Sequence, residues 1–190
     1  MKPPSIQPGL TYHIYNRGNN SQDTFFEDKN YRHFSNRMVK YLTSIGEVYA
    51  FCLMRNHYHL VIRIHEPAQL PLKYQSNPSQ VISNWLNSYV KMINLTRNRT
   101  GSLFEKNFER KIITTDDYLR QAIVYVHQNP LKHHIRKDFI NYPYSSMAHY
   151  QKESTYLIHT GFVFELFGGK EEFWRSHDDV NPDINLPDSP

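Results

Sequence analysis

Two histidines separated by one residue, His57 and His59, open an apolar run near the middle of the chain. Residues 58–64 are rich in aromatic and β-branched side chains, which favours a strand. Side chains alternate along a strand, so both imidazoles point to one face and Tyr58 points to the other, the expected core face. With a third ligand from elsewhere, the pair can hold one divalent ion. The alternative is that both are partly exposed strand residues with no shared role.

Tyr125 lies on a predicted helix that runs from about 116 to 128 and is followed directly by Asn129-Pro130. Thr115 provides a capping hydroxyl for this helix, and two acidic residues follow at its positive end. At about 100° per residue, Tyr125 and Asn129 fall one turn apart on a stripe beside the core face. They can therefore share one site. The alternative is that Tyr125 is an aromatic side chain at the edge of the core.

These four side chains together fit phosphoryl-transfer chemistry. Two imidazoles from His57 and His59 and the amide oxygen of Asn129 suit Mg²⁺ or Mn²⁺ better than structural zinc, which prefers closed nitrogen and sulfur sites. An ion held this way can bind a phosphate oxygen and neutralise charge. The hydroxyl of Tyr125 is then a reasonable nucleophile. Attack on a DNA phosphodiester leaves a 3′-hydroxyl and a 5′-phosphotyrosine, and the reverse step can join a different strand.

The remaining elements follow from periodicity and from glycine and proline positions. A strand is expected at 11–18, a helix at about 29–43, and a strand at 48–53 that forms an antiparallel hairpin with the histidine strand through a turn near Arg55-Asn56. Three prolines mark 65–79 as a connection. A helix follows through 81–93 and ends in the polar run 96–101. Residues 103–113 form either a short hairpin or one extended segment.

Charge is unevenly distributed along the 190 residues. The net charge is +4, but residues 171–190 hold six acids against Arg175, a net −5, so the first 170 residues carry +9. A basic body favours a polyanionic partner, although solubilising surface charge explains it equally simply. Between 91 and 111, six basic residues oppose two glutamates. The candidate nucleic-acid contacts are Arg17, Arg97, Arg99, Lys106, Arg110 and Lys111.

Composition indicates one domain at residues 1–150, a docked helical extension at 151–176 and an acidic, proline-rich disordered tail at 177–190. No apolar run approaches the roughly 20 residues of a membrane helix, and the N-terminus lacks a secretory signal. A single cysteine, Cys52, excludes an internal disulfide. We therefore expect a cytoplasmic protein. The adjacent histidines His133 and His134 diverge on a helix and are expected at the surface.

Several motifs, in order along residues 11–150, resemble the single-tyrosine HUH transposases, in particular the REP-associated tyrosine transposases. The motifs are Tyr12–Gly18 (YHIYNRG), Met54–Leu60 (MRNHYHL), Gly101–Phe104 (GSLF), Tyr118-Leu119, Tyr125–Pro130 (YVHQNP) and Tyr142–Ser146 (YPYSS).

The resemblance implies an α+β, ferredoxin-like antiparallel sheet with helices packed on one face. It also implies cleavage and rejoining of single-stranded DNA at or near hairpins through a phosphotyrosine on Tyr125. His57, His59 and Asn129 would ligate the metal. Tyr58 departs from the pattern, because aliphatic residues are usual between the two histidines; an apolar ring still fits the core face. The protein would act as a monomer or a homodimer.

Two other functions stay open on sequence grounds. The first is a domesticated module that binds hairpin DNA or RNA without cutting it, for which the basic zone would suffice. The second is a metal-dependent hydrolase without a covalent step. It needs a general base near the metal, for which His65 and Glu66 are the candidates.

Overall fold

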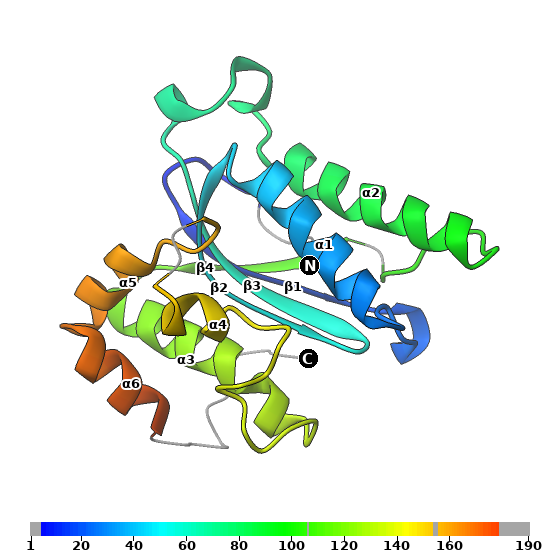
Figure 1. Cartoon of the computed structure of the whole chain (residues 1–190). Helices are drawn as coiled ribbons and strands as arrows, with labels where there is room; N and C mark the ends of the chain where they lie inside the picture. The colour runs from blue at the N-terminus through cyan, green and yellow to red at the C-terminus, as the bar shows by residue number, and fades with distance from the viewer. Residues whose placement is uncertain (1–4, 106, 154–155, 179–190) are drawn as a thin grey trace.

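A four-stranded antiparallel sheet forms the centre of the protein (Figure 1). The structure is a computed structural model that describes residues 5–105, 107–153 and 156–178. The strands β1 (Thr11–Arg17), β2 (Gly46–Met54), β3 (His57–Ile64) and β4 (Glu109–Ile113) lie in the order β2-β3-β1-β4. Every pairing is antiparallel, and the predicted hairpin is confirmed by the Met54–His57 pair that closes the Arg55-Asn56 turn.

Helices cover both faces of this sheet. α1 (Asp28–Leu42) and α2 (Ser79–Thr96) pack on the face of Tyr58, whose ring contacts Phe34 of α1 and Trp85 of α2. α3 (Asp116–Lys132) lies on the opposite face, where Tyr125 contacts His59. Adjacent residues of a strand point to opposite faces, so α3 is separated from α1 and α2 by the sheet.

The α+β class and the ferredoxin-like order β1-α1-β2-β3-α2-β4 are confirmed. The one-face packing expected of the helices describes α1 and α2 only. The central strands are apolar on one face and carry buried histidines on the other, so both faces need cover. α3 supplies the second layer.

The segment whose form stayed open, 103–113, shows no hairpin in its described residues, 103–105 and 107–113. Phe104 makes an isolated bridge to Gly18 at the end of β1, and the chain returns as the edge strand β4, beside Thr11–Tyr15 of β1. The segment before α2 contains two short 3₁₀ turns, η2 (Pro67–Gln69) and η3 (Leu72–Tyr74), and a third, η1 (Asn19–Ser21), follows β1. Within the described residues, no helix is long and apolar enough to cross a membrane.

α3 runs four residues further than the sequence predicts. The residue before a proline disfavours helical geometry, which places the predicted end before Asn129. The structure keeps both Asn129 and Pro130 inside the helix, which ends at Lys132. Pro130 removes one amide donor, but only in the last turn, where the helix is about to end. Asn129 is therefore held in helical geometry beside Tyr125.

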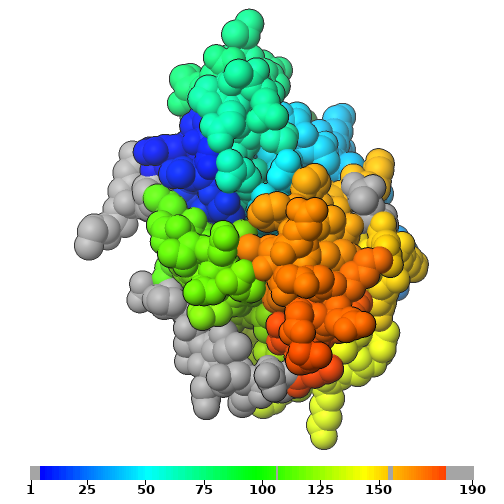
Figure 2. Space-filling model, turned by 90° about the vertical axis from the view of Figure 1, so that its left-hand side faces the viewer, coloured from blue at the N-terminus to red at the C-terminus, as the bar shows by residue number. Residues whose placement is uncertain are grey.

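The chain after α3 covers the free edge of β2 and then α3 itself. Residues 142–146 lie along β2, with Leu53 N–H donating to Tyr144 O and Ser146 N–H donating to Phe51 O. The helices α4 (Met147–Gln151), α5 (Thr160–Phe167) and α6 (Lys170–Asp178) follow. Figure 2 shows the orange and red surface of α5 and α6 beside the green surface near the start of α3. The expected disordered tail began at 177, but His177 and Asp178 end α6 and His177 is buried. Residues 179–190 lie outside the described residues.

Candidate metal and tyrosine site

His57 and His59 begin β3, and their side chains lie on the face that α3 covers. Both are buried, with 9% and 1% of their surface exposed. His57 Nδ1 lies 2.7 Å from Asn56 Oδ1, an amide oxygen that can only accept a hydrogen bond. The proton of neutral His57 is therefore on Nδ1. Its Nε2 carries a lone pair, and this atom is buried without a hydrogen-bond partner.

His59 is held by a residue that sequence reasoning missed. His59 Nδ1 lies 2.9 Å from Nε2 of His13, on the neighbouring strand β1, and the two rings stack at 5.1 Å. Nε2 of His59 is buried without a partner. Alternation places His13 on one face of its strand, but the β1–β3 pairing that brings it to His59 is not visible in the sequence.

Asn129 lies on α3, one helical turn after Tyr125. Its Nδ2 donates to the carbonyl of Tyr125 at 2.8 Å, which leaves Oδ1 buried without a partner. Buried polar atoms in folded proteins are nearly always hydrogen-bonded, so each exception asks for an explanation. The unpartnered atoms His57 Nε2, His59 Nε2 and Asn129 Oδ1 are the three that a divalent ion would use as ligands. The donor set fits such an ion.

This set depends on the amide. Within the described ranges, no three His, Cys, Asp or Glu side chains gather where they could share an ion. Two imidazoles without Asn129 would leave a site with two protein ligands. The second polar atom of each of the three residues is engaged by a neighbour, and such contacts orient metal ligands.

The imidazoles are neutral at ordinary pH. Burial, followed by the nearby His133 and Arg17, lowers the pKa of His57 to about 3. Burial, followed by the histidines around it, holds the pKa of His59 well below its ordinary value. Metal binding requires an unprotonated nitrogen, so these environments keep both histidines ready to act as ligands.

Tyr125 lies directly beside this group. Its ring meets the ring of His59 edge-on at 5.5 Å and that of His13 at 6.0 Å. The ammonium of Lys132, two turns further along α3, lies 4.8 Å from the centre of the Tyr125 ring. Only 2% of Tyr125 is exposed, so a DNA phosphate reaches it only if the side chains above it move.

Two of the predicted basic contacts flank the site. The register pairs Arg17 with His57 and Lys111 with His13, and residues paired in this way share a face of the sheet. His133 differs in part from its expected surface role, because its exposed ring also packs on that of His57 at 4.6 Å. The face of the sheet that carries the histidines therefore also carries two basic side chains, Arg17 and Lys111.

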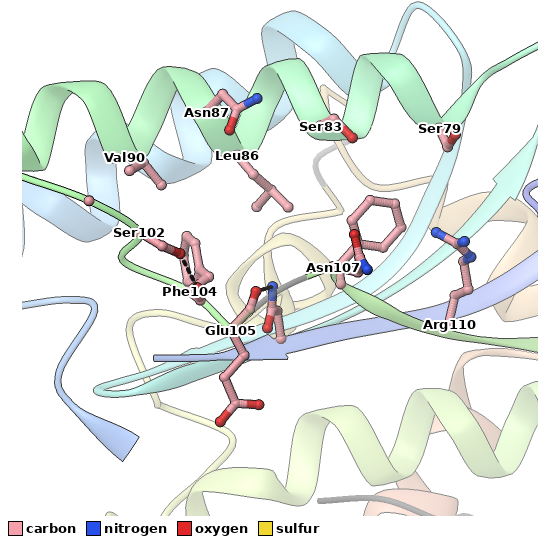
Figure 3. Close-up of a pocket in the computed structure, with 13 residues that line it drawn as sticks. Ser79, Ser83, Leu86, Asn87, Val90, Ser102, Phe104, Glu105, Asn107 and Arg110 are labelled. Carbon is pink, nitrogen blue, oxygen red and sulfur yellow. Dashed lines mark hydrogen bonds between the residues drawn. The ribbon is translucent and has the colours of Figure 1, made fainter. Parts of the chain in front are cut away.

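The other basic candidates lie elsewhere. Arg110 lines a hollow of about 530 Å³ between α2 and the chain leading into β4, on the opposite face from His13 (Figure 3). In that view Arg110 and Asn107 rise towards α2, and Leu86 points down from it. Arg97 and Arg99 follow α2 and line a separate hollow of about 560 Å³ with Phe26. Lys106 lies outside the described residues.

The bases considered for a hydrolase are remote from the histidines. Glu66 follows the far end of β3 and pairs with Arg63 at 3.1 Å, and the amide of His65 donates to Ile45. His65 is six positions after His59, roughly 20 Å away at about 3.3 Å per residue of extended chain. Neither side chain can act as a base at an ion held by His57 and His59.

Comparison with known proteins identifies the fold. No protein-family model and no curated protein matches the sequence. A solved structure of a REP-associated tyrosine transposase bound to a REP hairpin matches with a TM-score of 0.60 and 15% identity, covering 82% of this chain and 86% of that one. Bacterial tRNA(His) guanylyltransferase-like proteins in complex with ATP and with GTP match at TM-scores of 0.47 and 0.44 and 9% identity, covering 70% and 73% of this chain and 61% and 72% of theirs. The resemblance to REP-associated tyrosine transposases is confirmed at the level of the fold.

Proposed function

We propose that this protein is a metal-dependent endonuclease and transposase that cleaves and rejoins single-stranded DNA at or near hairpins. The observation that carries the proposal is the set of three unpartnered buried atoms on His57, His59 and Asn129, beside Tyr125. Binding of hairpin DNA is favoured by the shared fold with a transposase solved on a REP hairpin.

In this proposal, His57, His59 and Asn129 hold Mg²⁺ or Mn²⁺, which would bind a non-bridging phosphate oxygen and offset its charge. Asn56, His13 and the Tyr125 carbonyl orient the three ligands. Arg17 and Lys111, on the same face, add positive charge for the strand that carries the phosphate.

Tyr125 is the proposed nucleophile. Its phenol oxygen forms a bond to phosphorus while the bond from phosphorus to the 3′ oxygen breaks. The phenol proton leaves, and the departing oxygen takes up a proton to give a 3′-hydroxyl. The phosphate ester is kept on the tyrosine, so attack by another 3′-hydroxyl reverses the step and joins a new strand. Ligands and nucleophile come from one chain, so a monomer suffices.

A cleavage assay tests this function. Single-stranded hairpin DNA labelled at its 5′ end should be cut only with Mg²⁺ or Mn²⁺ present, and the product should carry a 3′-hydroxyl that a polymerase can extend. His57→Ala should lower the rate by at least 100-fold, because it removes a ligand. Lys40→Ala, at an exposed position on α1, serves as the control. Cutting that persists in excess chelator would contradict the metal role.

The alternative function is a module that binds hairpin DNA or RNA without cutting it. It would explain the basic face and the fold, but it assigns no purpose to the three unpartnered atoms. Tight hairpin binding with no cleavage, in either metal, would favour it.

A further inference from the structure

A chain of buried hydrogen bonds runs beside α3, from the edge strand β2 to α6. It joins Ser146, His127 and His177, whose side chains are essentially inaccessible. Ser146 Oγ lies 2.6 Å from His127 Nε2, and His127 Nδ1 lies 2.8 Å from His177 Nε2. The chain ends at Phe173 O, 2.7 Å from His177 Nδ1. None of these residues takes part in the site proposed above.

The two ends fix the direction of every bond. The carbonyl of Phe173 can only accept, so His177 carries its proton on Nδ1 and accepts at Nε2. His127 must then donate from Nδ1 and accept at Nε2, and the Ser146 hydroxyl must donate to it. The amide of Phe51, at 2.9 Å, can only donate to Ser146 Oγ. Both histidines are neutral, and only one arrangement satisfies all of these groups.

His127 lies between Tyr125 and Asn129 in the sequence but faces the opposite way. Two residues along a helix correspond to a rotation of about 200°. Tyr125 accordingly contacts His59 on the sheet, while His127 contacts His177 and Phe173 on α6. Gln128 adds a bond from its Nε2 to His177 O at 3.3 Å. Figure 1 shows α6 beside α3.

We infer that His127, Ser146 and His177 are positioning residues that set the rotation of α3, and through it the direction of Asn129 Oδ1. Apolar packing alone tolerates small rotations of a helix, whereas a chain of directed hydrogen bonds anchored on β2 and α6 does not. A metal ion binds tightly only when its ligand atoms lie within a few tenths of an ångström of their best positions. A small rotation of α3 therefore lowers the affinity for the ion. The inference rests on the proposed metal role of Asn129.

Two segments outside the metal site help to position α3. The Tyr142–Ser146 motif covers the edge of β2 and presents Ser146 to His127. The C-terminal helix α6 provides His177, so the helical extension becomes part of what arranges the site.

Mn²⁺ affinity, measured on the full-length protein by titration calorimetry without DNA, tests the inference. His177→Phe keeps a buried ring and removes the acceptor of His127; it should weaken Mn²⁺ binding by about 10-fold, as loss of contacts behind metal ligands does. Trp174→Leu is the matched control, because it removes apolar packing beside Phe173 and His177 but removes no member of the hydrogen-bond chain. His177→Gln, which retains a hydrogen-bonding side chain, should restore part of the affinity.

The outcomes separate this inference from the proposed function. Unchanged Mn²⁺ affinity in His177→Phe overturns the positioning role and leaves the proposed function standing. Equal losses in His177→Phe and Trp174→Leu, at equal melting temperatures, also overturn it, because the effect is then loss of stability alone. A wild-type protein that binds no Mn²⁺ contradicts the proposed metal role itself, and the positioning of Asn129 falls with it.

Discussion

At the scale of single residues, the chain buries polar atoms in two different ways. On the α3 face, His57 Nε2, His59 Nε2 and Asn129 Oδ1 are buried without a partner, as is Nδ1 of His13, and all are atoms that can offer a lone pair to an ion. On the other face, the Tyr58 hydroxyl is also buried without a partner, but it lies among Phe34, Trp85 and Phe104. The ring of Tyr58 therefore fits the core, as expected, but its unpaired hydroxyl lowers the free energy of unfolding.

Tyr58→Phe should stabilise the protein. An unsatisfied buried hydroxyl costs on the order of 1 kcal/mol or more, and phenylalanine removes it while keeping the ring. Urea denaturation should show the gain. The comparison is Tyr89→Phe in the same core, where the hydroxyl donates to Thr24 O at 2.7 Å; that variant should lose about 1 kcal/mol. Destabilisation of equal size in both variants would mean that the Tyr58 hydroxyl is satisfied.

At the scale of elements, sequence periodicity predicted what is local and missed what depends on pairing. The strands, the 54–57 turn and the shared face of His57 and His59 follow from alternation. His13 could not be assigned to the site, because it reaches His59 only through a pairing of strands more than 40 residues apart. Helical spacing placed Asn129 one turn from Tyr125, but the predicted helix ended at about 128; α3 continues through Asn129, whose Nδ2 donates to the Tyr125 carbonyl.

The junction of α3 and α6 predicts a dependence of stability on pH. Burial lowers the pKa of His177 to about 4, against 6.5 ordinarily. The unfolded chain therefore binds more protons between these values, so the free energy of unfolding should fall as pH drops from 6.5 to 4. His177 alone contributes a slope of up to about 1.4 kcal/mol per pH unit.

The measurement is urea denaturation of the metal-free protein across this pH range. His177→Phe should have a shallower slope than the wild type, since the group that takes up the proton is gone. The control is Phe164→Leu, which removes apolar packing beside Phe173 and no titratable group; its slope should match the wild type. Identical slopes in all three proteins would show that His177 does not gain a proton on unfolding.

At the scale of the whole molecule, the sheet separates two surfaces of different character. Arg17 and Lys111 share the histidine face, whereas Arg110, next to Lys111 in β4, lines the hollow under α2. If the proposed site acts on DNA, the backbone of the strand runs over the first surface. Charge on that face should then govern affinity and its dependence on salt.

Lys111→Ala should weaken binding of hairpin DNA and reduce the slope of log affinity against log salt concentration by about 1, as expected for one lost phosphate contact. Fluorescence anisotropy at several salt concentrations measures both. Lys40→Ala, at an exposed position on α1, is the control and should leave the slope unchanged. If Lys111→Ala leaves the slope unchanged, the DNA does not bind on the histidine face.

Covalent capture tests the central claim most directly. The protein is mixed with labelled single-stranded hairpin DNA and Mn²⁺, denatured, and separated on a gel. We expect a labelled band at the mass of protein plus the 3′ DNA fragment, absent with chelator and absent in Tyr125→Phe, with the attached nucleotide mapped to Tyr125 by mass spectrometry. An adduct of undiminished yield in Tyr125→Phe, or cleavage of the same DNA with no adduct at any time, would contradict it.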